Sequence, residues 1–137
     1  MGLSGVKAYA KMNAVTGVEN ADPHRLIQML LDGAIEKINR AKFFMLNKDI
    51  AEKGRHISWA ISIIGGLRSS LSFEKGGELA QSLDALYEYA IFTLVEANTE
   101  NNMQKLESAL QVIQEIKEGW DGIRSQVQPD GSKSVSQ

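Results

Sequence analysis

The side chains in this sequence that could bind a metal are two histidines and the acids near them, and their spacing does not complete a site. A di-iron centre in a helical bundle uses Glu-x-x-His on two helices, because residues three positions apart lie on one face. Neither His24 nor His56 has a glutamate three positions before it, and Glu52 precedes His56 by four. We therefore expect no metal centre, with His24 at the surface and His56 solvated or partly covered.

The other reactive arrangements are incomplete as well. Cysteine is absent, which excludes thiolate chemistry and disulfides. Gly76 and Gly77 precede an expected helix whose N-terminus could attract an anion, but Glu78 in its first turn would repel one. Asp84 and Glu88 lie one helical turn apart, and a solvated helix face explains both. The sequence therefore predicts that the protein is not an enzyme and needs no cofactor.

Length and composition describe one globular domain. The chain has 137 residues, of which 43% are hydrophobic and 23% charged, with a formal net charge of -2. These values are typical of a globular protein and unlike those of a basic nucleic-acid binder. No apolar run approaches the ~20 residues that cross a bilayer, and the first residues lack the charged region followed by an apolar region that is typical of a signal peptide. We expect no nucleic-acid partner, no membrane insertion and a cytoplasmic location.

Four amphipathic stretches are expected to form helices. Asp22 followed by Pro23 is a clear helix start, with the carboxylate as N-cap and the proline at the first helical position. Asp49, with Glu52 three residues later, resembles a capping box. Apolar residues recur at steps of three and four through each stretch, which is the period of an α-helix. The expected helices lie in the stretches 23–46, 50–71, 76–98 and 102–126. The loop 72–77 leads into the third stretch and includes its first two residues, Gly76 and Gly77.

The third of these helices, residues 76–98, organises the rest of the chain. Its inner stripe is expected to consist of small and large apolar residues, namely Leu79, Leu83, Leu86, Ala90, Leu94 and Ala97. Asn98 is expected to end the helix in the left-handed conformation. From Tyr87 to Val95 only Glu88 is charged, so the helix is apolar on several sides. A helix of this kind must be covered on more than one face.

These elements predict an all-α fold, an antiparallel up-down four-helix bundle over residues 21–126. Residues 1–20 are expected to form a short N-terminal helix or cap segment, with Val6, Tyr9 and Met12 on one side. So short a helix is stable only when it is docked. Residues 127–137 are rich in polar residues and are expected to form a flexible tail.

Several apolar residues lie outside the expected inner stripes and are candidates for partner binding. They are Trp59, Ile63, Ile91, Phe92, Val95, Val112 and Ile116, and Ile57 is added to them as a candidate although it belongs to the expected inner stripe of residues 50–71. Packing in the core or in a dimer explains the same residues, and the sequence does not decide between these readings. It also does not decide which face of the bundle is open, or whether the protein is a monomer or a weak dimer.

The sequence resembles the FliS family of flagellar secretion chaperones, over roughly residues 5–124. One block runs from Pro23 through the sequence DGAI at 32–35, and a second runs from GGELA at 76–80 through Leu86-Tyr87 and Tyr89 to Ala97-Asn98. The early Ala8-Tyr9 pair and the late Trp120 complete the match. The chain departs from the family where Leu31 replaces a usual aromatic residue and where Ser72-Phe73 replaces more usual polar loop residues.

The resemblance implies a flagellin-specific export chaperone. Proteins of this family form antiparallel four-helix bundles that bind the disordered C-terminal segment of flagellin, which becomes helical, and they prevent premature polymerisation before type III export. The resemblance also implies that the N-terminal segment covers the client groove and that Tyr9 contacts a component of the flagellar export gate. Two alternatives stay open: a structural or oligomeric bundle with no flagellin client, and a bundle that holds a cofactor or metal.

Overall fold

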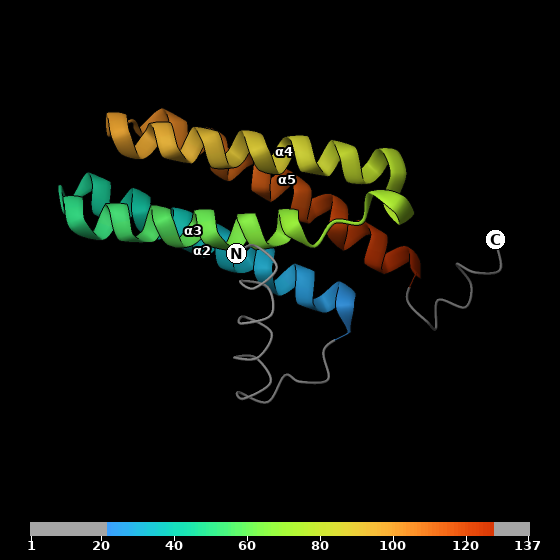
Figure 1. Cartoon of the computed structure of the whole chain (residues 1–137). Coiled ribbons are helices and arrows are strands. Elements are labelled where there is room, and N and C mark those ends of the chain that lie inside the picture. The colour runs from blue at the N-terminus through green and yellow to red at the C-terminus, as the bar shows by residue number, and fades with distance from the viewer. Residues whose placement is uncertain (1–21, 128–137) are drawn as a thin grey trace.

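The computed structural model describes residues 22–127, and these form four helices that pack side by side (Figure 1). They are α2 (Pro23–Leu46), α3 (Ile50–Ser69), α4 (Phe73–Glu100) and α5 (Met103–Val127). Both α3 and α5 pack against α2 and against α4. This arrangement confirms the expected all-α four-helix bundle. The expected cap segment with Val6, Tyr9 and Met12, and nearly all of the expected tail, lie outside the described residues.

The helix starts follow the capping signals in the sequence. Asp22 accepts a hydrogen bond from the main-chain nitrogen of Arg25 at 2.7 Å, and Asp49 accepts one from that of Glu52 at 3.2 Å. Each carboxylate thereby satisfies an amide that has no partner inside its helix. Both predicted starts are confirmed. Asn102 caps α5 in the same way, accepting from the main-chain nitrogen of Lys105 at 3.1 Å.

The two ends of α4 differ from the prediction. Residues 73–76, expected in a loop, form a first helical turn that Ser72 caps, and the helix is then interrupted at Gly77, which has φ 54° and ψ -129°. At the other end the helix continues past Asn98, and Asn101 is the left-handed residue, with φ 53°. The buried Lys53 of α3 explains the longer end, because its ammonium donates to the main-chain oxygen of Asn98 and the side-chain oxygen of Asn101, both at 3.1 Å.

The core lies between all four helices and is made of aliphatic side chains with alanines between them. Fully buried large residues are Leu30, Leu31, Ile38, Ile57, Ile64, Leu67, Leu94, Leu106 and Ile113. Burial of one such side chain stabilises the fold by about 1.5–3 kcal/mol. Ala34, Ala60, Ala90 and Ala109 are also fully buried and let the helix backbones approach.

The inner stripe of α4 is rotated from the predicted one. Leu79 and Leu86 are 55% and 41% exposed, whereas Ala80 and Tyr87, each one residue later, face the core. The residues of α4 that face the core follow each other at alternating steps of three and four, as the narrow seam of a helical bundle requires. They are Ala80, Leu83, Tyr87, Ala90, Leu94 and Ala97, of which only Leu83 is half-buried and the others are buried. The prediction that Leu79 and Leu86 face the core was wrong. The apolar residues of α4 cover a wider band of the helix surface than the seam buries, so the two leucines are left at its edge.

Candidate partner-binding surface

Two hollows lie at the end of the bundle where α2 begins and α5 ends. The first, the end hollow, has a volume of about 330 Å³ and lies among the ends of all four helices, with Ile27, Leu71, Tyr87 and Trp120 among its lining residues. The second, the α4–α5 groove, has about 250 Å³ and is lined mainly by Leu79, Leu83, Leu86, Val112, Ile116, Trp120 and Ile123. Leu79, Leu83 and Trp120 line both, so the two hollows adjoin and their apolar linings form one continuous surface.

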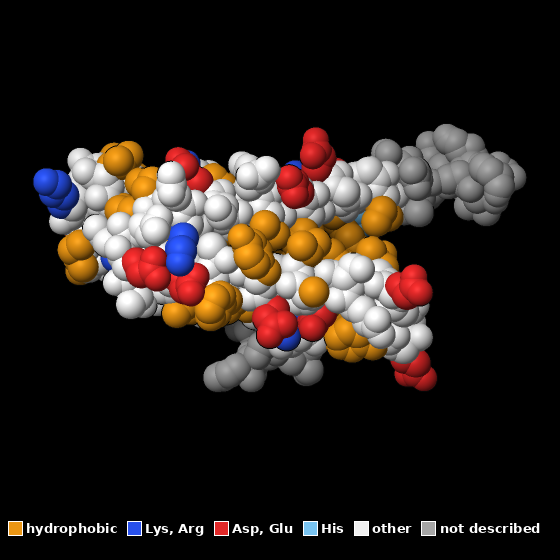
Figure 2. Space-filling view, turned by 90° about the horizontal axis from the view of Figure 1, so that it is seen from above, with side chains coloured by type: hydrophobic (Ala, Val, Ile, Leu, Met, Phe, Trp, Pro, Cys, Tyr) orange, Lys and Arg blue, Asp and Glu red, His pale blue; other side chains and the backbone are white. Residues whose placement is uncertain are grey.

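The continuous surface is apolar over most of its length. Figure 2 looks down on the side of the bundle formed by α4 and α5, and it shows hydrophobic side chains gathered in a band with acidic side chains on either side of it. Leu79 and Leu86 lie two helical turns apart on one edge of this band, about 10 Å along the axis of α4. A groove with apolar anchors at this spacing fits one face of an amphipathic helix.

Glycines shape the start of α4. Gly77 has φ 54°, a conformation that L side chains rarely adopt, and it separates the first turn from the rest of the helix. Figure 1 shows this turn displaced from the axis of the remainder of α4. Gly76 lines the end hollow, and a Cβ atom there would lie 2.8 Å from the Cβ of Ala80. The two glycines therefore allow the chain to turn closely around the mouth of the end hollow.

Trp120 is held in place by His24, the second residue of α2. The two rings stack with centroids 4.6 Å apart and planes within 10°. The indole nitrogen donates to the main-chain oxygen of His24 at 3.0 Å, and Nε2 of His24 lies 2.8 Å from the main-chain oxygen of Trp120. Because a carbonyl oxygen only accepts, Nε2 carries the hydrogen. The expectation that His24 is a surface residue was wrong, since this pairing half-buries it.

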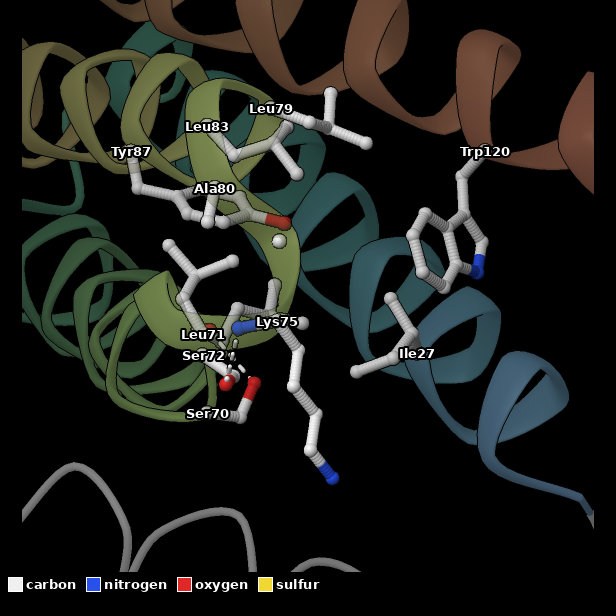
Figure 3. Close-up of a pocket in the computed structure, with 12 residues that line it drawn as sticks. Ile27, Ser70, Leu71, Ser72, Lys75, Leu79, Ala80, Leu83, Tyr87 and Trp120 are labelled. Atoms are coloured by element: carbon white, nitrogen blue, oxygen red, sulfur yellow. Dashed lines mark hydrogen bonds between the residues drawn. The ribbon is translucent and has the colours of Figure 1, made fainter.

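Tyr87 forms part of the floor of the end hollow. Its side chain comes from the core-facing side of α4 and is only 3% exposed. In Figure 3 its hydroxyl points into the hollow, on the side toward Leu79 and Trp120. Burial raises the pKa of Tyr87 to about 12, so the phenol keeps its proton at neutral pH.

The eight residues predicted to bind a partner do not form one site. Ile57 and Ile63 are buried in the core, because they lie on the sides of α3 that pack against α2 and α4. The placement of Ile63 outside the inner stripe was wrong, whereas Ile57 is buried as its position on that stripe predicts. Ile116 is buried too, but its side chain lines the α4–α5 groove next to that of Val112. Ile91 is half-buried against the core.

The three remaining residues are exposed on other faces. Phe92 is 61% exposed, and at 100° per residue it lies about 120° around α4 from Leu86. Val95 is exposed on the opposite side of α4 from Leu86 by the same geometry. Trp59 is exposed on α3, where the ammonium of Lys37 lies 3.7 Å above its ring. Exposed apolar side chains thus occur on several separate faces of the bundle.

Sequence reasoning missed most of the residues that line the hollows. Leu79 and Leu86 were assigned to the core, and neither Tyr87 nor Trp120 was assigned to a binding surface. The pair Gly76-Gly77 was the available signal, because two glycines directly before an apolar stretch indicate a break in the helix. The stacking of His24 on Trp120 had no local signal, since 96 positions separate the two residues.

The composition of the two hollows suits the binding of an apolar partner. Among residues 22–127 no three His, Asp or Glu side chains lie close enough together to hold a metal ion. Within the same range no helix is both long and apolar enough to cross a membrane. The hollows instead offer apolar walls with a few hydroxyl groups, which is the usual composition of a site that takes up an apolar ligand or helix.

Comparison with known proteins identifies relatives over nearly the whole chain. The family model described as "Flagellar protein FliS" matches residues 5–127. The flagellar secretion chaperone FliSB of Pseudomonas aeruginosa is 47% identical over 121 residues, which cover 88% of this chain and 96% of that protein. The flagellar secretion chaperone FliS of Salmonella typhimurium is 43% identical over 121 residues, covering 88% and 90%. FliS of Bacillus subtilis is 29% identical over 103 residues, covering 75% and 76%.

Proposed function

The chain belongs to the FliS family of flagellar proteins, and we propose that it is a flagellar export chaperone whose client is flagellin. It binds the disordered C-terminal segment of flagellin in the cytosol, prevents premature polymerisation and assists delivery to the flagellar type III export apparatus. The relatives' names support the chaperone role, because the identity extends over nearly the full length of both chains. The client and the export steps follow from the resemblance.

The observation that carries the proposal is the continuous apolar surface of the end hollow and the α4–α5 groove. Leu79 and Leu86 are 55% and 41% exposed although each has an aliphatic side chain that burial would stabilise. Contiguous exposed apolar surface of this kind commonly marks an interaction site. A client segment that folds into a helix can bury these leucines with residues at positions i, i+3 or i+4, and i+7.

Exposed apolar residues on other faces fit a client that wraps around the bundle. Trp59, Phe92 and Val95 stay in the proposed client surface, and so do Ile91, Val112 and Ile116 at the edges of the helices. The buried Ile57 and Ile63 would affect a client only through the packing of α3. Ordering a client segment around the bundle costs several kcal/mol of binding free energy, because the segment loses conformational entropy. The free energy gained by burying apolar surface must offset this cost.

The N-terminal segment has a proposed role of its own. By the family resemblance, Val6, Tyr9 and Met12 cover the client surface until the client displaces them, and Tyr9 contacts a component of the export gate. Deletion of residues 1–16 should then leave helicity intact and increase the fluorescence of an apolar dye. Unchanged dye binding together with lost helicity would show that the segment belongs to the core.

Titration calorimetry with a peptide of the flagellin C-terminal segment tests the function. We expect saturable binding with a large negative heat-capacity change and a gain in helicity by circular dichroism, because disordered chain folds onto apolar surface. A peptide of the same composition in scrambled order is the control. Absence of binding, together with a stable dimer in sedimentation, would favour the alternative of a structural or oligomeric bundle.

A further inference from the structure

The hydroxyl of Tyr87 is a polar group that faces the mostly apolar end hollow. The side chain is 3% exposed, yet its hydroxyl points into the open space of the hollow (Figure 3). No hydrogen bond formed within residues 22–127 includes this hydroxyl. A phenol that is otherwise buried normally finds a partner inside the protein, because an unmet hydrogen bond costs free energy. In Tyr87 the hydroxyl is left facing the site where a client would dock.

The neighbouring groups do not supply that partner. The walls around the hydroxyl are mostly apolar, with Ile27, Leu79 and Trp120 among them. Ser70 donates its own hydroxyl to the main-chain oxygen of Leu67 at 2.8 Å, and Ser72 caps the first turn of α4 at the rim. The lining residues include no acid. Residues 22–127 thus supply no acceptor for the hydroxyl of Tyr87, and one has to enter the hollow as water, as another part of the chain or as part of the client.

We infer that the hydroxyl of Tyr87 is a specificity-determining group that donates a hydrogen bond to a neutral oxygen acceptor of the client segment. The inference rests on the proposed function. The acceptor is an amide side chain, or a main-chain carbonyl that is left free at the end of a client helix. A carboxylate is disfavoured, because a charge among apolar walls is poorly solvated and Lys75, the cation of the lining, extends away from the hollow in Figure 3.

This hydrogen bond would give the hollow a selectivity that its apolar walls lack. A hydrophobic pocket discriminates only weakly between aliphatic side chains of similar size. A buried donor is different, because a segment that enters without an acceptor leaves the donor unpaired. Tyr87 would thus favour one register of the client over registers that bring only aliphatic side chains into the hollow.

The substitution Tyr87→Phe tests the inference, because it keeps the ring that lines the hollow and removes only the oxygen. Tyr89→Phe is the matched control, since Tyr89 lies two residues further along α4 and is exposed. In calorimetry with the flagellin C-terminal peptide we expect Tyr87→Phe to weaken binding about three- to tenfold. Tyr89→Phe should stay within about twofold of the unmodified protein. The unfolding temperature of Tyr87→Phe should not fall, because the hydroxyl has no partner within the described chain to lose.

Peptides in which each amide side chain is replaced in turn by an aliphatic one identify the acceptor. Replacement of an accepting side chain should weaken binding to the unmodified protein but not to Tyr87→Phe. If no replacement shows this coupling while Tyr87→Phe still binds more weakly, the acceptor is a main-chain carbonyl. Equal affinity of Tyr87→Phe and unmodified protein would overturn the inference and leave the proposed function standing, and so would a lowered unfolding temperature with unchanged affinity. Failure of the unmodified protein to bind would instead refute the proposed function.

Discussion

The interruption of α4 at Gly77 leads to a quantitative prediction for the substitution Gly77→Ala. The backbone there has φ 54° and ψ -129°, and a Cβ atom added to Gly77 would meet nothing within 4 Å. The effect of the substitution is therefore confined to the backbone. Residues with a side chain are destabilised in this conformation by about 1–3 kcal/mol. We expect Gly77→Ala to lower the free energy of unfolding by that amount.

Gly65→Ala is the matched control for this measurement. Gly65 lies inside α3, and a Cβ atom added there also meets nothing within 4 Å. Because alanine is favoured over glycine in a helix interior by about 1 kcal/mol, Gly65→Ala should raise the free energy of unfolding. Two substitutions that are identical in chemistry and in free space should thus have opposite signs. Steric crowding cannot produce this difference, and only the backbone conformation distinguishes the sites.

Urea denaturation followed by circular dichroism at equilibrium measures both variants. The slope of the free energy against urea concentration should match that of the unmodified protein, since neither change alters the surface exposed on unfolding. The reasoning would be refuted if Gly77→Ala were as stable as the unmodified protein or more stable. Such a result would mean that α4 becomes continuous through residue 77 at no cost. The mouth of the end hollow would then not depend on the positive φ angle.

Two further predictions concern the α4–α5 groove and the buried tyrosine. Leu86→Glu should weaken binding of the flagellin C-terminal peptide by tenfold or more in calorimetry, because it places a charge where about 1.5–3 kcal/mol of apolar burial is expected. The control Gln81→Glu adds the same charge on another side of α4 and should change the affinity by less than about twofold. Equal effects of the two substitutions would show that the α4–α5 groove does not bind the peptide. The folded-state pKa of Tyr87 is raised to about 12 by burial, so the stability it contributes is present below its unfolded-state pKa of about 10 and is lost as the pH rises toward 12. Between pH 10 and 12 the unmodified protein should therefore lose about 2–3 kcal/mol more unfolding free energy than Tyr87→Phe in urea titrations, and parallel curves would contradict the burial of the phenol.

The fold could be predicted because the helices of a bundle begin at capping residues and carry an apolar period that is visible within each helix. Asp22 with Pro23, and Asp49 with Glu52, mark helix starts through contacts within one turn. The stretch over which apolar residues recur at steps of three and four then predicts the length of each helix to within a few residues. The end of α4 shows the limit of local signals, since Asn98 and Asn101 are equally suited to a left-handed position. Lys53, which lies 48 positions before Asn101, stabilises the longer helix.

The candidate surface could not be predicted, because it depends on how far the apolar band of each helix is covered. Leu86 and Tyr87 are neighbours in an apolar run, and the sequence favoured Leu86 for the core. The packed bundle takes Tyr87 inward and leaves Leu86 at the edge next to Val112. Hydrophobicity alone does not distinguish these residues, because the choice depends on the relative rotation of α4 and α5. That rotation is a property of the assembled bundle and of no single helix.

The cap that Lys53 places on α4 joins the end of this helix to α3, at the end of the bundle opposite the hollows. At that end Lys53 links α3 to the reversal after α4, and Lys105 of α5 lies 2.9 Å from Glu96 of α4. The stretch of α4 from Gly77 to the reversal is roughly 35 Å long at 1.5 Å per residue. A tilt of only about 5° about the tethered end therefore displaces the opposite end by about 3 Å. If α4 tilts about the end that Lys53 holds, the end hollow, where Leu79 faces solvent, is therefore the part of the bundle that widens most.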